Sequence, residues 1–234
     1  MDIIKKIAEE LQIKATQAEA AVKLIDEGCT IPFIARYRKE MTGALNDETL
    51  RNLHERLLYL RNLEEKKEQV INAITDQGKM TEDLKEKILS AETLVAVDDL
   101  YRPYRPKKQT RATKAKEKGL EPLANILFLQ KTTKSMEEEA AAFVNAEKGV
   151  ANAKEAIAGA KDIIAEMIAD MADYRKSIRN CTMKQGSLVV KAKDEKAESV
   201  YEMYYDFREP LSKVTGYRVL AINRGEKEKF LTVK

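Results

Sequence analysis

Apolar residues recur at a helical spacing through one long stretch of the chain. They are three or four positions apart, and include Leu50, Leu53, Leu57, Leu60, Ile71 and Ile74. Side chains at this spacing share one face of an α-helix, so we predict a single helix from about Asn46 to Gly78. Glu64 and Lys67 interrupt the apolar stripe, which argues against a coiled coil. A chain with such a helix must cover its apolar face with other elements.

Composition and capping residues predict further helices around the long one. Gly (9) and Pro (5) are few, while hydrophobic residues make up 44% of the chain and charged residues 35%. Each shorter helical pattern starts at a residue whose side chain can accept amide hydrogens of the first turn. These residues are Asp2, Thr16, Thr30, Thr81, Thr110 and Ser135. Ala-rich helices over 150–172 and 173–184 permit close helix packing. The predicted fold is mainly α, with several helices and a helix-turn-helix-like element.

The pattern changes to short β-branched segments after Gly186. We predict strands at 187–193, 217–223 and 229–234, and a helical aromatic segment that ends at Pro210. The chain would therefore divide into a helical domain over residues 1–185 and a small β-containing segment over 186–234. Because no turn follows the last strand, we expect its partner strand to lie beyond Lys234 in a longer protein.

Positive charge is concentrated in residues 102–118. The net charge is only +3, yet this segment holds eight Lys or Arg against a single Glu. Two prolines alternate with Tyr101 and Tyr104, and residues 93–106 are expected to be extended because proline ends helices. Rings that stack on bases, interleaved with cations that neutralise phosphates, suit single-stranded nucleic acid. The alternative is that the tyrosines pack the turn against helices and the cations are simply solvated.

A second candidate surface is the segment IPFIARYRKEM. On a helical wheel Phe33, Tyr37 and Met41 fall on one side, and Arg36 and Lys39 fall opposite. We predict that the aromatic side belongs to the core and that the cations form an exposed face. Together with the preceding helix this segment resembles a helix-turn-helix, but its first turn, Ile-Pro-Phe-Ile, cannot hydrogen-bond to base edges. Phosphate contact is therefore favoured over sequence-specific reading.

The candidate nucleic-acid contacts carry a positive charge or an aromatic ring in one of these two segments. They are Arg36, Lys39, Arg102, Tyr104, Arg105, Lys107, Lys108, Arg111 and Lys114. Binding through such residues is expected to be weak, nonspecific and better for single strands, because charge and stacking carry little sequence information. The choice between RNA and DNA is open.

No arrangement of residues in the sequence predicts catalysis. Asp98 and Asp99 are adjacent, and they lack a third acid or a His at a useful spacing. Cys29 and Cys181 are far apart, and His54 is the only His. Phosphate-binding and dinucleotide-binding glycine motifs do not occur. We expect a non-enzymatic chain with no cofactor, no metal and no small-molecule substrate.

Nothing in the sequence indicates a membrane protein. No apolar run approaches the roughly 20 residues that a membrane span requires. The N-terminal segment, MDIIKKIAEEL, is too polar for a signal peptide. We expect a cytoplasmic protein.

Four segments give the chain a family resemblance. They are FIARYRKEMTG, DLYRPYRPKKQTRATKAKEKGLEPLA, FVNAEKGV and YRVLAINRGE. With these segments in this order, the chain resembles the N-terminal region of Tex, a family of bacterial transcription accessory proteins. The resemblance implies a helical region with a helix-turn-helix-like element. It also implies that an RNase H-like domain, a helix-hairpin-helix domain and an OB-fold RNA-binding domain follow.

Two classes of function are consistent with these features. The first is a non-catalytic N-terminal part of a transcription-associated nucleic-acid-binding protein. The second is a scaffold that braces further domains or contacts the transcription machinery, with the basic segment meeting an acidic protein. Salt-dependent binding of RNA or DNA by this chain separates the two classes.

Overall fold

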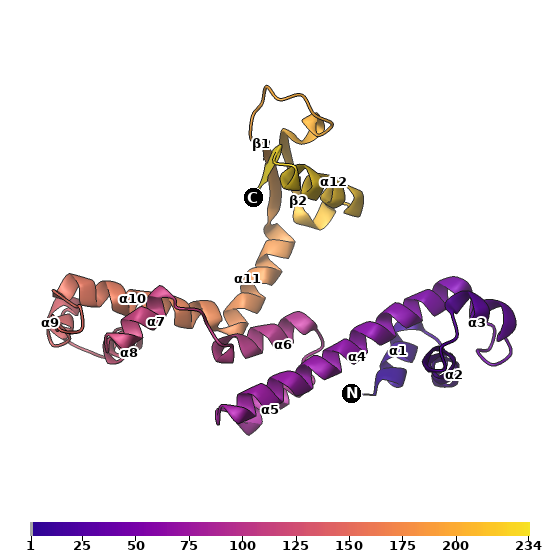
Figure 1. Ribbon diagram of the computed structural model, residues 1–234, viewed down its shortest axis with the longest axis horizontal. Coiled ribbons are helices and arrows are strands. Elements are labelled where there is room, and N and C mark those ends of the chain that lie inside the picture. Colours follow the sequence, from indigo (N-terminus) through magenta and orange to yellow (C-terminus); the bar gives the residue numbers. More distant parts are fainter. Residues whose placement is uncertain (1) are drawn as a thin grey trace. The chain divides into compact units, whose positions relative to one another are not determined.

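The computed structural model describes residues 2–234, which form two compact units (Figure 1). The first unit ends at Lys107 and the second begins at Lys108. Helices dominate both units, and a small antiparallel sheet lies in the second. The mainly α fold with a small β-containing C-terminal segment is confirmed, whereas a domain boundary at residue 185 stays a prediction.

The first unit is organised around the long helix α4 (Asp47–Asp76), which the leucine spacing predicts. Asn46 caps it by accepting a hydrogen bond from the Thr49 amide at 2.7 Å. Five other helices of this unit contact α4. They are α1 (Ile3–Leu11), α2 (Ala15–Asp26), α3 (Ile31–Tyr37), α5 (Glu82–Ser90) and α6 (Leu94–Tyr101), and a 3-10 helix, η1 (Arg102–Tyr104), follows α6.

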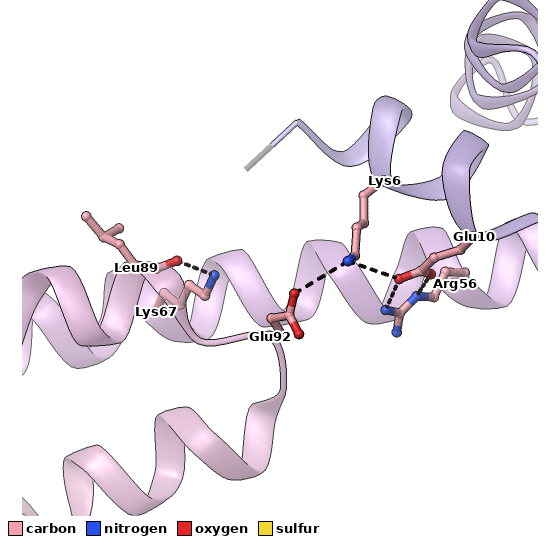
Figure 2. A network of polar contacts seen from close by, with 6 residues as sticks. All are labelled: Lys6, Glu10, Arg56, Lys67, Leu89 and Glu92. Carbon is pink, nitrogen blue, oxygen red and sulfur yellow. Dashed lines mark hydrogen bonds and ion pairs between the residues drawn. The ribbon is translucent and has the colours of Figure 1, made fainter.

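The buried face of α4 includes a lysine. Lys67 lies in phase with the buried leucines, and only 2% of its surface is exposed. Its Nζ donates to Glu64 Oε1 at 2.8 Å. It also donates to the carbonyl oxygen of Leu89 at 2.8 Å (Figure 2). The Leu89 carbonyl belongs to the last turn of α5, where carbonyls lack partners within the helix. The stem of Lys67 therefore fills the core while its ammonium group caps α5.

Ion pairs fix α1 and α2 on α4. Arg56 donates to both carboxylate oxygens of Glu10 at 2.5 and 2.8 Å, and Arg61 binds Asp26 in the same bidentate way at 2.7 and 2.8 Å. Lys6 lies 3.7 Å from the same Glu10 carboxylate and links it to the chain after α5 (Figure 2). Two-point Arg–carboxylate pairs constrain orientation as well as distance.

Three predictions for the first unit need correction. Residues 94–101 are helical rather than extended, because Thr93 caps α6 and a proline disrupts only the turn it enters. Helix α2 begins at Ala15, ahead of the predicted cap at Thr16, since the Gln17 side chain reaches back to the Lys14 amide at 3.1 Å.

The third correction concerns α3, which ends at Tyr37 and buries only Ile34. Phe33 and Tyr37 are exposed, so the prediction that they belong to the core is wrong. This helix of two turns faces the unit's core with Ile34 and the partly buried Ile31 and Ala35, and its two rings lie outside that face. A short turn joins α2 to α3; whether the pair works as a helix-turn-helix stays a prediction.

The second unit contains two apolar clusters, one among helices and one on a sheet. The helices are α7 (Arg111–Glu117), α8 (Glu121–Leu129), α9 (Met136–Ala141), α10 (Ala153–Asp170) and α11 (Ala172–Gln185). The predicted close packing of the Ala-rich helix is confirmed on α10, where Ala156 and Ala160 are fully buried. A Cβ at Gly159 would come within 2.4 Å of Leu120 Cδ1, so α10 and the start of α8 approach closely.

The sheet has the order β2-β1-β3, and both pairings are antiparallel. Val190, on the central strand, and Leu231 are fully buried and cluster with Ile222 of the α-helix that covers the sheet. The elements are β1 (Ser187–Ala192), η2 (Glu202–Tyr204), β2 (Asp206–Pro210), η3 (Leu211–Lys213), α12 (Gly216–Lys227) and β3 (Leu231–Val233).

The predictions for this segment were partly wrong. Residues 217–223 form helix α12 rather than a strand, because burial recurs three residues apart, at Ile222 and Gly225. Residues 206–210 form β2 rather than a helix, and Pro210 is tolerated at the end of an edge strand. The last strand was expected to lack a partner, but β3 pairs with β1 through Val190 and Val233.

The Arg56–Glu10 pair makes the free energy of unfolding depend on pH in the acidic range. The hydrogen bond from Arg56 lowers the pKa of Glu10 below its ordinary value of 4.5, and this outweighs the opposing effect of partial burial. A carboxylate with a lowered folded-state pKa stabilises the fold above the unfolded value and loses that contribution as pH falls through the folded value. As the pH falls below about 4.5, the unfolding free energy of Arg56→Met should therefore decrease less than that of the parent chain.

Urea unfolding at a series of pH values measures this effect. Arg51→Met is the matched control, because Arg51 pairs only locally with Asp47 on exposed α4 surface. It should keep the acid dependence of the parent chain. An acid dependence in Arg56→Met equal to that of the parent would contradict the assignment.

Candidate functional site

The predicted basic segment is shared between the two units. Tyr104, Arg105 and Lys107 belong to the first unit along with Arg102, whereas Lys108 and the cations of α7 belong to the second. The two halves therefore have different local environments.

In the first unit the basic segment is a packed turn. Tyr101 and Tyr104 are half-buried against the core around α4, and the Tyr104 carbonyl accepts a hydrogen bond from Gln77 Nε2 at 3.0 Å. Arg105 donates to Asp98 at 2.7 Å, and its guanidinium lies 5.6 Å from the centre of the Tyr101 ring. These contacts agree with the alternative interpretation, in which the two tyrosines pack the turn against helices.

In the second unit the basic segment becomes α7. Thr110 caps this helix by accepting a hydrogen bond from the Thr113 amide at 3.0 Å. Ala112 and Ala115 are buried against α10, while Arg111, Lys114 and Lys118 are exposed at the rim of this contact. Arg111 is almost fully exposed, although its Nε lies 3.5 Å from Asp162 on α10.

A groove of about 280 Å³ lies in this unit between α7, α10 and the turn before α10. Its cationic lining is Arg111, Lys114 and Lys118, and its acids are Glu155 and Asp162. Within residues 2–234, neither Lys114 nor Lys108 has an ion-pair partner. The groove is therefore a concave surface with a small excess of positive charge, which favours an anionic ligand.

Lys118 lines the groove and was not among the predicted site residues. Lys118 Nζ donates to the Gly149 carbonyl at 2.8 Å, which fixes the end of α7 to the 145–150 turn. Lys148, which is outside the groove lining, also reaches the end of α7, because a Cβ on Gly119 would lie 3.6 Å from its Nζ. The sequence signal was the segment FVNAEKGV, in which Asn145 and Val150 pair across a tight turn and Gly149 has a φ of +71°.

The remaining predicted site residues lie on the first unit. Arg36 is in the last turn of α3, Lys39 is in the turn that follows, and both are exposed. They are not part of the groove, which lies wholly in the second unit.

The acidic pair has structural partners. Asp98 binds Arg105, and Asp99 is buried and has a partner of its own. Across residues 2–234, no group of three or more His, Cys, Asp or Glu side chains is placed to hold a metal ion. No helix in that range is long and apolar enough to cross a membrane.

Comparison with protein families matches both ends of the chain. Residues 1–75 match the Tex-like protein N-terminal domain, and residues 131–234 match the Tex central region-like family. The chain belongs to the Tex family. The basic segment lies between the two matched regions of this Tex-like chain.

Named relatives agree with this assignment. The chain is 44% identical to YdcI of Bacillus subtilis over 98% of its length, and 40% identical to the transcriptional accessory protein Tex of Neisseria gonorrhoeae over 100%. It is 31% identical over 100% of its length to the human S1 RNA-binding domain-containing protein 1. It spans only 32%, 31% and 24% of these three proteins, respectively.

The packed position of Tyr104 predicts a loss of stability when its ring is removed. Tyr104→Ala should lower the unfolding free energy by about 1–2 kcal/mol, because the change removes the apolar area that the half-buried ring buries against the core. Tyr104→Phe keeps the ring and should change it by less than about 0.5 kcal/mol. Thermal melts of the three chains test this, and an unchanged midpoint for Tyr104→Ala would show that the ring is free rather than packed.

Proposed function

We propose that this Tex-like chain is the nucleic-acid-contacting N-terminal part of a transcription-associated protein, and that its α7–α10 groove holds the phosphate backbone. The observation that carries the proposal is the set of cations around that groove. Arg111, Lys114 and Lys118 follow one another along α7 at spacings of three and four, so they share one side of the helix. The row spans about 10 Å, which is long enough for more than one phosphate of a strand.

The character of the groove favours weak, nonspecific binding to a single strand. Lysine ammonium groups act as point charges toward phosphates and carry no sequence information. The acids Glu155 and Asp162 share the groove with the cations and reduce its excess charge. Binding through this site is therefore expected to be modest and strongly dependent on salt.

The names of relatives support the choice of ligand and process. One relative is a transcriptional accessory protein, and another contains an S1 RNA-binding domain. For this chain, association with nucleic acid during transcription, in the cytoplasm, follows as a proposal from the family and from the groove together.

Reversing the charge of the groove should weaken binding. In the triple variant Arg111→Glu, Lys114→Glu, Lys118→Glu, affinity for a fluorescent single-stranded oligonucleotide should fall for all sequences. The slope of log affinity against log salt should flatten by about 2, at about 0.7 for each lost phosphate contact. Fluorescence anisotropy at several salt concentrations measures both quantities.

The matched control is Lys176→Glu, Lys184→Glu, Lys193→Glu. These lysines are exposed in the same unit, and reversing them changes the net charge equally. The control should keep a slope close to that of the parent chain. Equal losses in the two triple variants would mean that only the net charge matters, and the groove would not be the site.

We also propose that this part of the protein is not catalytic. The salt bridge of Asp98 and the burial of Asp99 give both acids structural roles. Nuclease and nucleotide-hydrolysis assays with Mg²⁺ or Mn²⁺ should give no turnover above background. Turnover that disappears in Asp98→Asn would contradict this proposal.

One observation favours the scaffold as the alternative function. Helix α11 buries none of its residues, yet Met171 at its cap, Tyr174 and Ile178 are exposed at spacings of three and four. An apolar stripe of this kind suits another protein surface. If the chain binds no oligonucleotide at low salt, the scaffold becomes the better proposal.

A further inference from the structure

An aromatic and apolar surface is exposed at the end of α3. The exposed fraction is 37% for Phe33, 67% for Tyr37 and 52% for Met41. Sequence periodicity assigns these side chains to the core, but only Ile34 of α3 is buried. Large exposed side chains that gather at one place are a common feature of binding surfaces.

The two rings form a pair with a cation beside it. The ring centroids of Phe33 and Tyr37 are 5.4 Å apart and their planes are inclined by 44°. The Arg38 guanidinium lies 5.2 Å from the centre of the Phe33 ring. Phe33 is thus engaged by its neighbours, while the Tyr37 ring is the most exposed member of the group.

The backbone that carries this surface is fixed by buried contacts and by hydrogen bonds. Ile34 anchors α3 in the core, and Gln17 Nε2 donates to the carbonyls of Thr42 and Gly43 at 3.2 and 3.0 Å. Thr42 is fully buried, and its hydroxyl donates to the Arg38 carbonyl at 3.3 Å. The turn after α3 is therefore fixed without help from the exposed rings, and a fixed surface loses less entropy on binding.

The charge around the rings is complementary to an anion. Arg36, Arg38 and Lys39 are exposed, against the single acid Glu40. Within residues 2–234, neither Arg36 nor Lys39 forms an ion pair or a hydrogen bond through its side chain. The surface combines accessible ring faces with uncompensated cations.

We propose that Tyr37 is a stacking platform for an unpaired base of single-stranded nucleic acid, with Arg36, Arg38 and Lys39 on the flanking phosphates. Aromatic rings beside cations bind single strands irrespective of sequence. An acidic peptide would use the cations but gain little from an open ring face. The inference rests on the proposed function for its class of ligand only, since it uses a different surface in the other unit.

A tryptophan at this position gives a direct test. The chain contains no Trp, so Tyr37→Trp introduces a unique fluorophore. Titration of the 234-residue chain with a single-stranded oligonucleotide should quench its emission, because a base stacks on the indole. Tyr217→Trp is the matched control: Tyr217 is 65% exposed, and the Arg218 guanidinium lies 5.7 Å from its ring centre. Emission from the control should not change.

A second measurement separates stacking from charge. Tyr37→Ala should weaken oligonucleotide binding by about 5-fold or more, while Tyr37→Phe, which keeps the ring, binds like the parent. The salt slope should be unchanged in both, because no charge is lost. The melting temperature should also be unchanged, because the ring is exposed.

Three outcomes would overturn the inference. They are an unquenched Tyr37→Trp chain, equal quenching of the Tyr217→Trp control, and quenching by polyglutamate without quenching by the oligonucleotide. The groove is judged separately with the triple charge-reversal variant. Binding lost in that variant with an unquenched Tyr37→Trp chain refutes only the stacking platform. Quenching with an unaltered salt slope in the triple variant refutes only the groove.

Discussion

The first unit depends on one face of α4 and on the lysine within it. Leu53, Leu60 and their neighbours bury that face completely, and five helices pack against the helix. Lys67 is buried in the same row, where an unpaired charge would be very costly. Its hydrogen bonds to Glu64 and to the Leu89 carbonyl remove that cost and fix the end of α5 on α4. This buried lysine is thereby also a contact between two helices.

The two candidate surfaces have a common origin: each lies on a short helix that buries only a few of its side chains and leaves the others exposed. In the first unit the short helix α3 contacts the core through Ile34, Ile31 and Ala35. Phe33 and Tyr37 remain exposed. In the second unit the small residues of α10 let α7 lie close through Ala112 and Ala115. The cations of α7 stay exposed, and Arg111 and Lys114 line the groove beside α10. Each unit thus keeps exposed cations next to the helix contact that it buries.

Sequence periodicity predicted the elements that are long or capped. The helix α4, the cap of α5 at Thr81 and the capping box at Ser135 follow from spacing and from short polar side chains. It failed where tertiary contacts decide. Ile222 and Gly225 make residues 216–227 a helix because they fit against the sheet, and no local signal excluded a strand. The groove was only half predictable, since Glu155 and Asp162 reach it through the packing of α10 on α7 rather than through sequence proximity.

The central claim is that both cationic surfaces of this Tex-like chain contact the same class of ligand, a single strand of nucleic acid. Hydrogen exchange of the 234-residue chain, with and without an excess of single-stranded oligonucleotide at low salt, tests it most directly. The account predicts slower amide exchange in two places, the turn at residues 38–43 and the groove segments at 108–118 and 145–150. Slowing confined to α11 and α12, or no slowing anywhere, would contradict it.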